Sequence, residues 1–172
     1  AVACTNRSTS SEQDEMRHWN NVLQQINALL LENKARQTLD LAKQTLPEIL
    51  ESAEKNGTTD TLIYYARKIF NACGNNYINT KQYKDGIDYM DSIGNHPLIR
   101  EHCPHELLSF KAGLNQLYGN NPEAVRLAED YLQLPVCTSA NDFIRQAEII
   151  SGVYMYSGNN LPKAIQILEK AI

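Results

Sequence analysis

Residues 70–90, FNACGNNYINTKQYKDGIDYM, decide the fold of this chain. Phe70, Gly74 and Tyr77 recur at the three- and four-residue spacing that places side chains on one face of a helix, and Gly86 and Met90 repeat this spacing further on. The polar stretch 79–82 lies between the two patterns. The segment therefore predicts two helices joined by a tight turn.

The same pattern occurs four times along the chain. Each passage has a small residue that opens a helix, followed by apolar or small residues four and seven positions later: Ala35, Leu39, Ala42; Gly86, Met90, Ile93; Ala124, Ala128, Tyr131; Ala164, Leu168, Ala171. A second small residue precedes the last three of these anchors by twelve positions, at Gly74, Ala112 and Gly152. Three passages then close on a proline, at Pro47, Pro97 and Pro135. Periodicity of this kind indicates an internal repeat.

These passages resemble the tetratricopeptide repeat (TPR). The resemblance covers residues 14–172, although Lys111, Asn115 and Glu148 depart from its usual apolar positions. It implies an all-α chain, a right-handed solenoid of about four TPR-like helical hairpins, in which small residues let helices approach and prolines stop them. Solenoids of this kind usually bind partners, so we expect a binding module and no enzyme.

The helix boundaries have clear signals. Gly57 separates two helical stretches, 48–55 and 60–66, and Gly-Asn-rich turns with a following proline occur at 119–122 and 158–162. The anchors Gly86, Ala124 and Ala164 are 38 and 40 residues apart, more than the usual value of about 34, so we expect longer helices. These signals predict about eight helices and no strand.

Composition excludes some classes of function. At 172 residues the chain fits one repeat domain, and its net charge of −4 provides no basic surface for nucleic acid. No stretch reaches the roughly 18 apolar residues of a membrane span. Any membrane attachment would need an anchor at Cys4 or a span outside this chain.

The N-terminus is unlike the rest. Small residues precede Cys4, and a polar stretch follows, so we expect residues 1–13 to be a flexible tether. The segment resembles the end of a bacterial lipoprotein signal peptide, which implies lipidation of Cys4 and a periplasmic or cell-envelope location. The alternative is a free cysteine in a tail, with a cytoplasmic location.

Residues 100–106, REHCPHE, contain metal-ligand types. Their spacing matches no zinc pattern, and Pro104 predicts the start of a helix, so we expect no metal and no cofactor. No phosphate loop or nucleophile motif occurs in the sequence, and we expect no catalytic residues. In an exported protein, Cys103 and Cys137 either pair between repeats or remain thiols.

The resemblance also implies a concave binding face formed by the first helix of each repeat. Its members here are rich in carboxamides, which suits a protein or peptide partner, or a small polar ligand. The alternative is a merely solvated face. The residues are Arg17, Asn20, Gln24, Asn27, Lys68, Asn71, Asn75, Ile78, Glu106, Ser109 and Gln116.

Several kinds of whole protein fit these features, including one in which a kinase or other enzyme domain follows the repeats. The chain resembles the periplasmic N-terminal region of Bacteroides-type sensor histidine kinases or regulators, which implies a sensory domain in two-component signal transduction. In that case the solenoid would be truncated after Ile172. The alternative is a standalone TPR lipoprotein that acts as a scaffold or assembly factor at the cell envelope.

Overall fold

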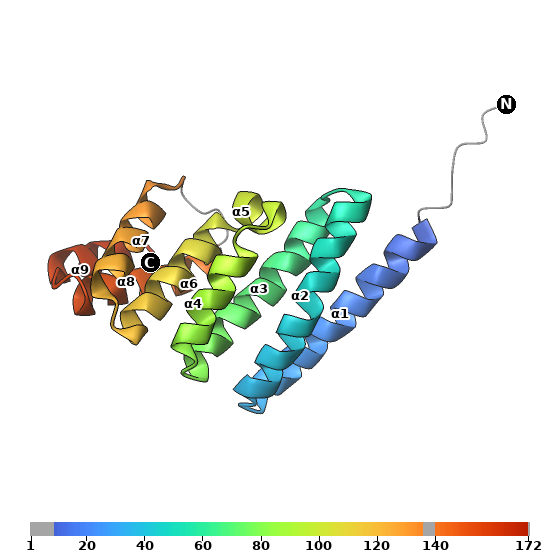
Figure 1. Cartoon of the computed structure of the whole chain (residues 1–172), viewed down its shortest axis with the longest axis horizontal. Helices are drawn as coiled ribbons and strands as arrows, with labels where there is room; N and C mark the ends of the chain where they lie inside the picture. The colour runs from blue at the N-terminus through green and yellow to red at the C-terminus, as the bar shows by residue number, and fades with distance from the viewer. Residues whose placement is uncertain (1–8, 136–139, 172) are drawn as a thin grey trace. The chain divides into compact units, whose positions relative to one another are not determined.

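The computed structural model describes residues 9–135 and 140–171, and within these ranges it contains α-helices and no strand (Figure 1). The prediction of an all-α chain is therefore confirmed. Nine helices are described, and the one beyond the expected eight is the short α5. Their bounds are α1 (Thr9–Leu31), α2 (Ala35–Asn56), α3 (Asp60–Asn79), α4 (Tyr83–Ile93), α5 (Pro97–His102), α6 (Pro104–Tyr118), α7 (Asn121–Gln133), α8 (Ala140–Tyr156) and α9 (Leu161–Glu169).

The chain forms two compact units whose boundary falls inside α3. Unit 1 ends at Cys73 and unit 2 begins at Gly74. In unit 1, α1 packs against α2. On both helices the buried apolar residues recur every three or four positions, as expected for one packed face: Trp19, Val22 and Ile26 on α1, and Leu39, Ala42, Leu46 and Ile49 on α2. Trp19 is thus part of the core of unit 1.

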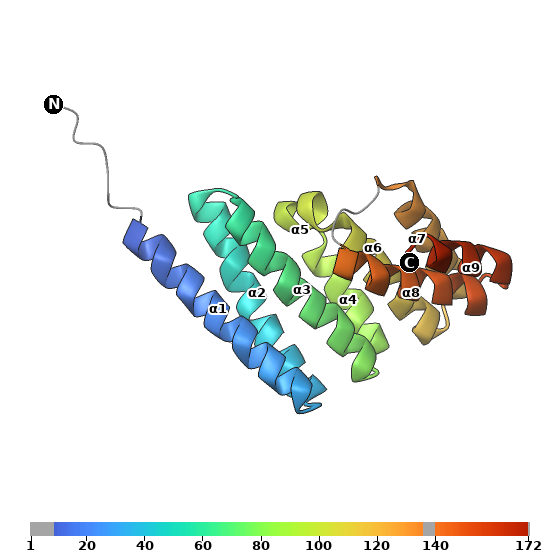
Figure 2. The same ribbon diagram turned by 180° about the vertical axis from the view of Figure 1, so that it is seen from behind.

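Unit 2 is organised around α6. This helix packs against α4, α5, α7 and α8, and α8 also pairs with α9; Figure 2 brings α8 and α9 forward. Three small residues of the predicted pattern, Ala112, Ala124 and Ala164, belong to the core of this unit, whereas Gly152 is half-buried. The core of unit 2 contains Ala112, Ala124, Leu127, Ala128, Tyr131, Ile150, Val153, Tyr154 and Ala164.

One turn geometry joins three pairs of successive helices. A residue with positive φ follows the first helix, and the N–H of the next residue donates to the carbonyl oxygen five residues back, as in a Schellman motif. The φ values are 56° at Asn33, 58° at Lys81 and 94° at Gly119. The donor–acceptor distances are 2.9 Å for Lys34–Leu29, 3.1 Å for Gln82–Tyr77 and 2.9 Å for Asn120–Asn115. The predicted turn at 79–82 is therefore confirmed, and it has equivalents before α2 and α7.

This turn corrects the register of the first repeat. Gly86 and Ala124 are the fourth residues of their helices and are buried, and the equivalent residue of α2 is Thr38, not Ala35. Thr38 is fully buried, whereas Ala35 is half-buried. The Thr38 hydroxyl donates to the carbonyl oxygen of Lys34 at 3.0 Å, so a polar side chain can occupy this buried position.

The three prolines do not all end a repeat. Pro47 lies inside α2, which continues to Asn56, so the prediction that it closes the first repeat is wrong. The buried residues Ile49, Leu50 and Ala53 explain why the helix persists beyond the proline, because they anchor its second half in the core. Pro97 instead begins α5, and Pro135 follows the end of α7.

The N-terminal boundary also differs from the expectation. Helix α1 begins at Thr9, so residues 9–13 of the predicted tether are helical. Cys4 lies outside the described residues, and so does Cys137. Gly57, at φ 86°, follows α2 as predicted.

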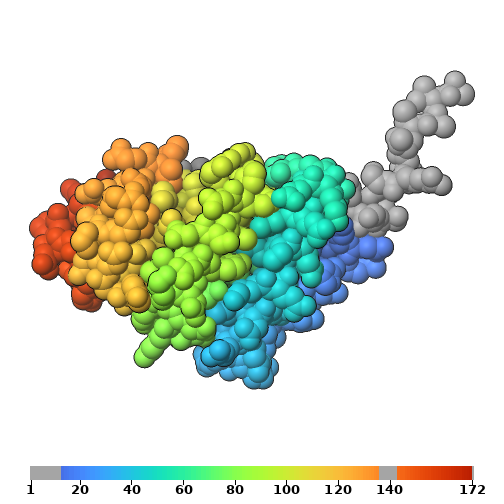
Figure 3. Space-filling view, viewed as in Figure 1, coloured from blue at the N-terminus to red at the C-terminus, as the bar shows by residue number. Residues whose placement is uncertain are grey.

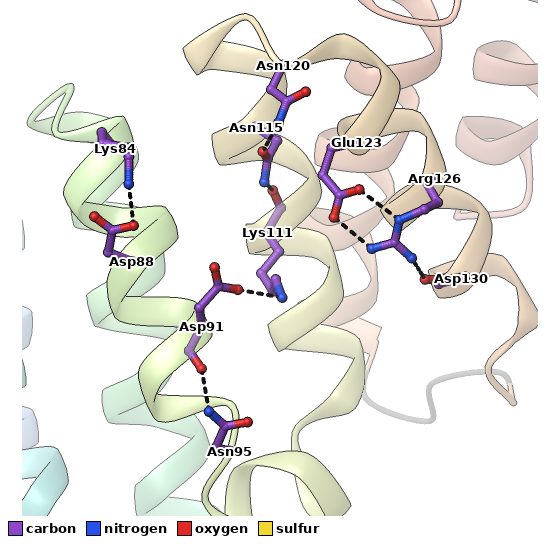
Figure 4. A network of polar contacts seen from close by, with 10 residues as sticks. All are labelled: Lys84, Asp88, Asp91, Asn95, Lys111, Asn115, Asn120, Glu123, Arg126 and Asp130. Atoms are coloured by element: carbon purple, nitrogen blue, oxygen red, sulfur yellow. Dashed lines mark hydrogen bonds and ion pairs between the residues drawn. The ribbon is translucent and has the colours of Figure 1, made fainter.

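Ion pairs link α4 to α6 and neighbouring turns of α7 in unit 2 (Figure 4). The Lys111 ammonium of α6 lies 2.6 Å from an Asp91 carboxylate oxygen of α4. On α7, Arg126 donates to both oxygens of Glu123 and to Asp130 at 2.7–2.8 Å. The hydrogen bond from Arg126 holds the pKa of the Glu123 carboxyl below its ordinary value. In the space-filling view, atoms of α4 (green) and α7 (orange) are exposed on the face of unit 2 that is turned to the viewer (Figure 3).

Candidate functional site

Unit 2 contains an open cleft of about 470 Å³. It is bounded by the start of α6, the end of α7, the start of α8 and the last two turns of α9. Its volume falls within the range of roughly 300–1,000 Å³ that is typical of small-molecule sites. The lining residues are His105, Tyr131, Leu132, Leu134, Pro135, Phe143, Ala147, Lys163, Gln166, Ile167 and Lys170.

Hydrogen bonds and ring packing fix one wall of the cleft. The His105 Nε2–H donates to the carbonyl oxygen of Pro135, with a nitrogen–oxygen distance of 2.6 Å. The rings of His105 and Tyr131 pack edge to face, with centroids 5.8 Å apart. Behind this wall, the Tyr131 hydroxyl donates to the Gln146 Oε1 at 2.9 Å. The end of α7 is thereby attached to α6 and α8, and the wall is preformed.

Lysines provide the charge of the cleft. Lys163 and Lys170 both line it, and none of its described lining residues is acidic. The Lys163 ammonium lies 4.3 Å from the centroid of the Tyr154 ring, a cation–π contact. Among the described residues, neither lysine forms an ion pair with a carboxylate. The cleft is therefore apolar with cationic groups, within a chain whose net charge is −4.

Unit 1 contains a smaller hollow of about 150 Å³ beside Trp19. A chain of polar contacts crosses it, because the Asn56 amide donates to the Ser52 hydroxyl at 3.3 Å and this hydroxyl donates to Glu15 at 3.0 Å. Three of its polar side chains, Glu15, Ser52 and Asn56, thus bind one another. Its smaller volume and the hydrogen bonds among these three side chains make it a weaker candidate than the cleft.

The predicted concave-face residues of unit 1 are accessible to different degrees. Exposed on α1 are Arg17, Asn20, Gln24 and Asn27, and half-buried on α3 are Lys68 and Asn71. Arg17 forms an exposed ion pair with Asp14 at 3.6 Å. The Lys68 ammonium lies 5.9 Å from the centroid of the Tyr64 ring.

The predicted residues of unit 2 need a correction. Glu106 is 2% exposed and Ser109 is fully buried, so neither forms part of an open face. The physical reason is that α6 has neighbours on several sides: Gly113, one turn beyond Ser109, would place a Cβ only 2.7 Å from Ile149 of α8. Asn75, Ile78 and Gln116 remain half-buried, and Asn75 accepts a 3.0 Å hydrogen bond from Arg145.

The other predicted features can be located in part. Pro104 begins α6, as expected, and Cys103 is buried at its N-cap. Within the described ranges, no three potential metal-ligating side chains gather at one place. None of the described helices is both long and apolar enough to cross a membrane.

Sequence reasoning missed most of the cleft. Its lining comes from four helices, and residues such as Phe143 and Ile167 show only the ordinary apolar periodicity of a core helix. The nearest local signal was the cluster at 100–106, which contains His105. No family model matches this chain, and no curated protein or solved structure matches it either.

Proposed function

We propose that this chain is a binding module built from TPR-like helical hairpins, and that it recognises its partner or ligand through the cleft of unit 2. One observation carries the proposal: an open cleft of about 470 Å³ has a largely apolar lining, and the charged groups among its described lining residues are lysines. Apolar surface that stays open to solvent costs free energy unless something covers it. A ligand that covers this apolar lining would therefore be stabilised by its burial.

The repeated turn supports the repeat part of this proposal. A residue with positive φ and an equivalent backbone hydrogen bond precede each of α2, α4 and α7, and the fourth residue of each helix is buried. These fourth residues are Thr38, Gly86 and Ala124. One local structure that recurs with its core position is the expected signature of a solenoid. A right-handed TPR-like arrangement is the simplest repeat consistent with these features.

The biological setting follows from the N-terminal sequence. We propose that the module is the sensory or interaction domain of a bacterial cell-envelope protein, with Cys4 as its anchor. Binding at the cleft would then be the input, because a ligand stabilises the conformation to which it binds more tightly.

Position-specific photo-crosslinking tests the binding role. A photoreactive phenylalanine analogue that replaces Leu132 would line the cleft. The same analogue in place of Leu117 is the matched control, because both leucines are 38% exposed but Leu117 does not line the cleft. In cells of the source organism, we expect a crosslinked product from position 132 and none from position 117. The additional change Ile167→Asp should abolish the product. Equal products from both positions, or a product that survives Ile167→Asp, would contradict the cleft as the site.

A further inference from the structure

We propose that the ligand of this cleft is an apolar monocarboxylate with an unbranched alkyl chain, such as a medium-chain fatty acid. This inference rests on the proposed binding function and specifies the chemistry of its ligand. Two features of the described lining carry it: its charged side chains are lysines, and it offers few groups that could form hydrogen bonds with a peptide backbone.

The charge favours an anion. Lys163 lies in α9, and Lys170, seven residues later, directly follows the helix in a helical backbone conformation. The two lysines are therefore on one side of the helix, about 10 Å apart along its axis. No acidic side chain occurs among the described lining residues, although acidic residues outnumber basic ones by 20 to 16 in the whole chain. A carboxylate at the mouth of the cleft would thus meet ammonium groups without like-charge repulsion.

Lys163 lines the cleft and is restrained by two contacts. Its backbone N–H donates to the Asn160 side-chain oxygen at 3.1 Å, which caps α9, and its ammonium packs on the Tyr154 ring. A lysine whose ammonium is already restrained loses less conformational entropy when it binds a carboxylate. Lys170 is exposed and forms no ion pair among the described residues, so its charge is also available.

The interior favours an alkyl chain over a peptide. A buried peptide needs a hydrogen-bond partner for each N–H and C=O group, and each unpaired group costs roughly 1–3 kcal/mol. Gln166 is the one carboxamide in the described lining, and His105 already donates to Pro135. The remaining walls are formed by apolar side chains, including Leu134, Phe143 and Ile167. An alkyl chain buries apolar surface there and leaves no polar group unpaired.

Calorimetric titration with decanoate, below its micelle concentration, tests this inference on the whole chain. Decanol is the matched neutral ligand, because it has the same alkyl chain and no charge. We expect saturable binding of decanoate and binding of decanol that is at least several-fold weaker. Equal affinity for the two ligands would overturn the role of the lysines, and a failure of decanoate to bind would overturn the inference as a whole.

Lysine variants locate the binding. Lys163→Gln and Lys170→Gln should each weaken decanoate binding about threefold, and the double variant about tenfold, as expected for partly exposed ion pairs. Lys84→Gln on α4 is the control, since Lys84 is exposed and pairs with Asp88 away from the cleft. It should leave the affinity unchanged, and equal losses in all variants would overturn the assignment.

The two proposals fail in different ways. If decanoate does not bind but the crosslinker at Leu132 still captures a specific partner, the binding function stands and the monocarboxylate inference is wrong. If decanoate binds and prevents crosslinking from position 132, the binding function and the monocarboxylate inference are both supported. If neither occurs, both are wrong.

Discussion

Gly74 offers the sharpest test of the packing in unit 2. A Cβ built at Gly74 would lie 2.4–2.5 Å from three ring atoms of Phe110, whose side chain is 2% exposed. Gly74→Ala should gain about 1 kcal/mol of helix propensity in α3. Overpacking costs typically 1–3 kcal/mol, and contact with three atoms of a buried ring places this change at the upper end. We therefore expect a net loss of about 2 kcal/mol in the free energy of unfolding.

Gly152→Ala is the matched control. The repeat pattern treats Gly152 as equivalent to Gly74, but a Cβ there would meet only the Gln116 Oε1, at 4.0 Å. Only the propensity gain remains, so this variant should be more stable than the original chain by about 0.5–1 kcal/mol. The opposite signs of the two changes would separate close packing from the loss of a helical glycine.

Urea unfolding followed by circular dichroism at 222 nm measures both changes, with the slope of free energy against urea compared between variants. The double variant Gly74→Ala, Phe110→Leu should recover part of the loss, because the contacting residues are energetically coupled. A Gly74→Ala protein as stable as the original would refute the packing argument. If Gly152→Ala destabilised the protein as much as Gly74→Ala, the two glycines would be equally closely packed, as the sequence pattern implies.

Three further predictions follow from other features. Gly119 has φ +94°, and a Cβ added there would have no neighbour within 4 Å, so Gly119→Ala should cost about 1 kcal/mol from backbone strain alone, and urea unfolding should show a smaller loss for Gly119→Asn. Arg126 lowers the pKa of Glu123 from its ordinary value of 4.5, so the pair stabilises the fold above that pH and loses its effect as the pH falls through the lower, folded-state pKa. Glu123→Gln should therefore lower the free energy of unfolding at neutral pH by less than about 1 kcal/mol, which a slightly lower melting temperature would show. A difference between the two proteins that persists in strong acid would contradict this. Cys4→Ala in the full-length protein should abolish metabolic labelling with a radioactive fatty acid, and unchanged labelling would exclude the lipoprotein prediction.

Local signals in the sequence were sufficient for the helices and most of their ends. Periodicity at three and four residues predicted an all-α chain, and Gly57, the loop before Tyr83 and Pro104 marked boundaries that the structure confirms. These signals work because a helix end depends on a few neighbouring residues: a glycine that accepts positive φ, or a proline that needs no hydrogen-bond donor. The same kind of signal failed at Pro47, where burial of the following turns outweighs the missing hydrogen bond.

The sequence by itself therefore determined that this chain is helical, that small residues recur inside it and where most helices begin. Only the tertiary structure decided that Thr38 occupies the buried position, that Glu106 and Ser109 are covered, and that Lys163 and Lys170 share a cleft with Phe143. The reason is that burial and clefts depend on which helix lies against which, over distances of many residues. A periodic apolar pattern identifies the face of a helix that packs, but not the neighbour that covers it or the space that remains open.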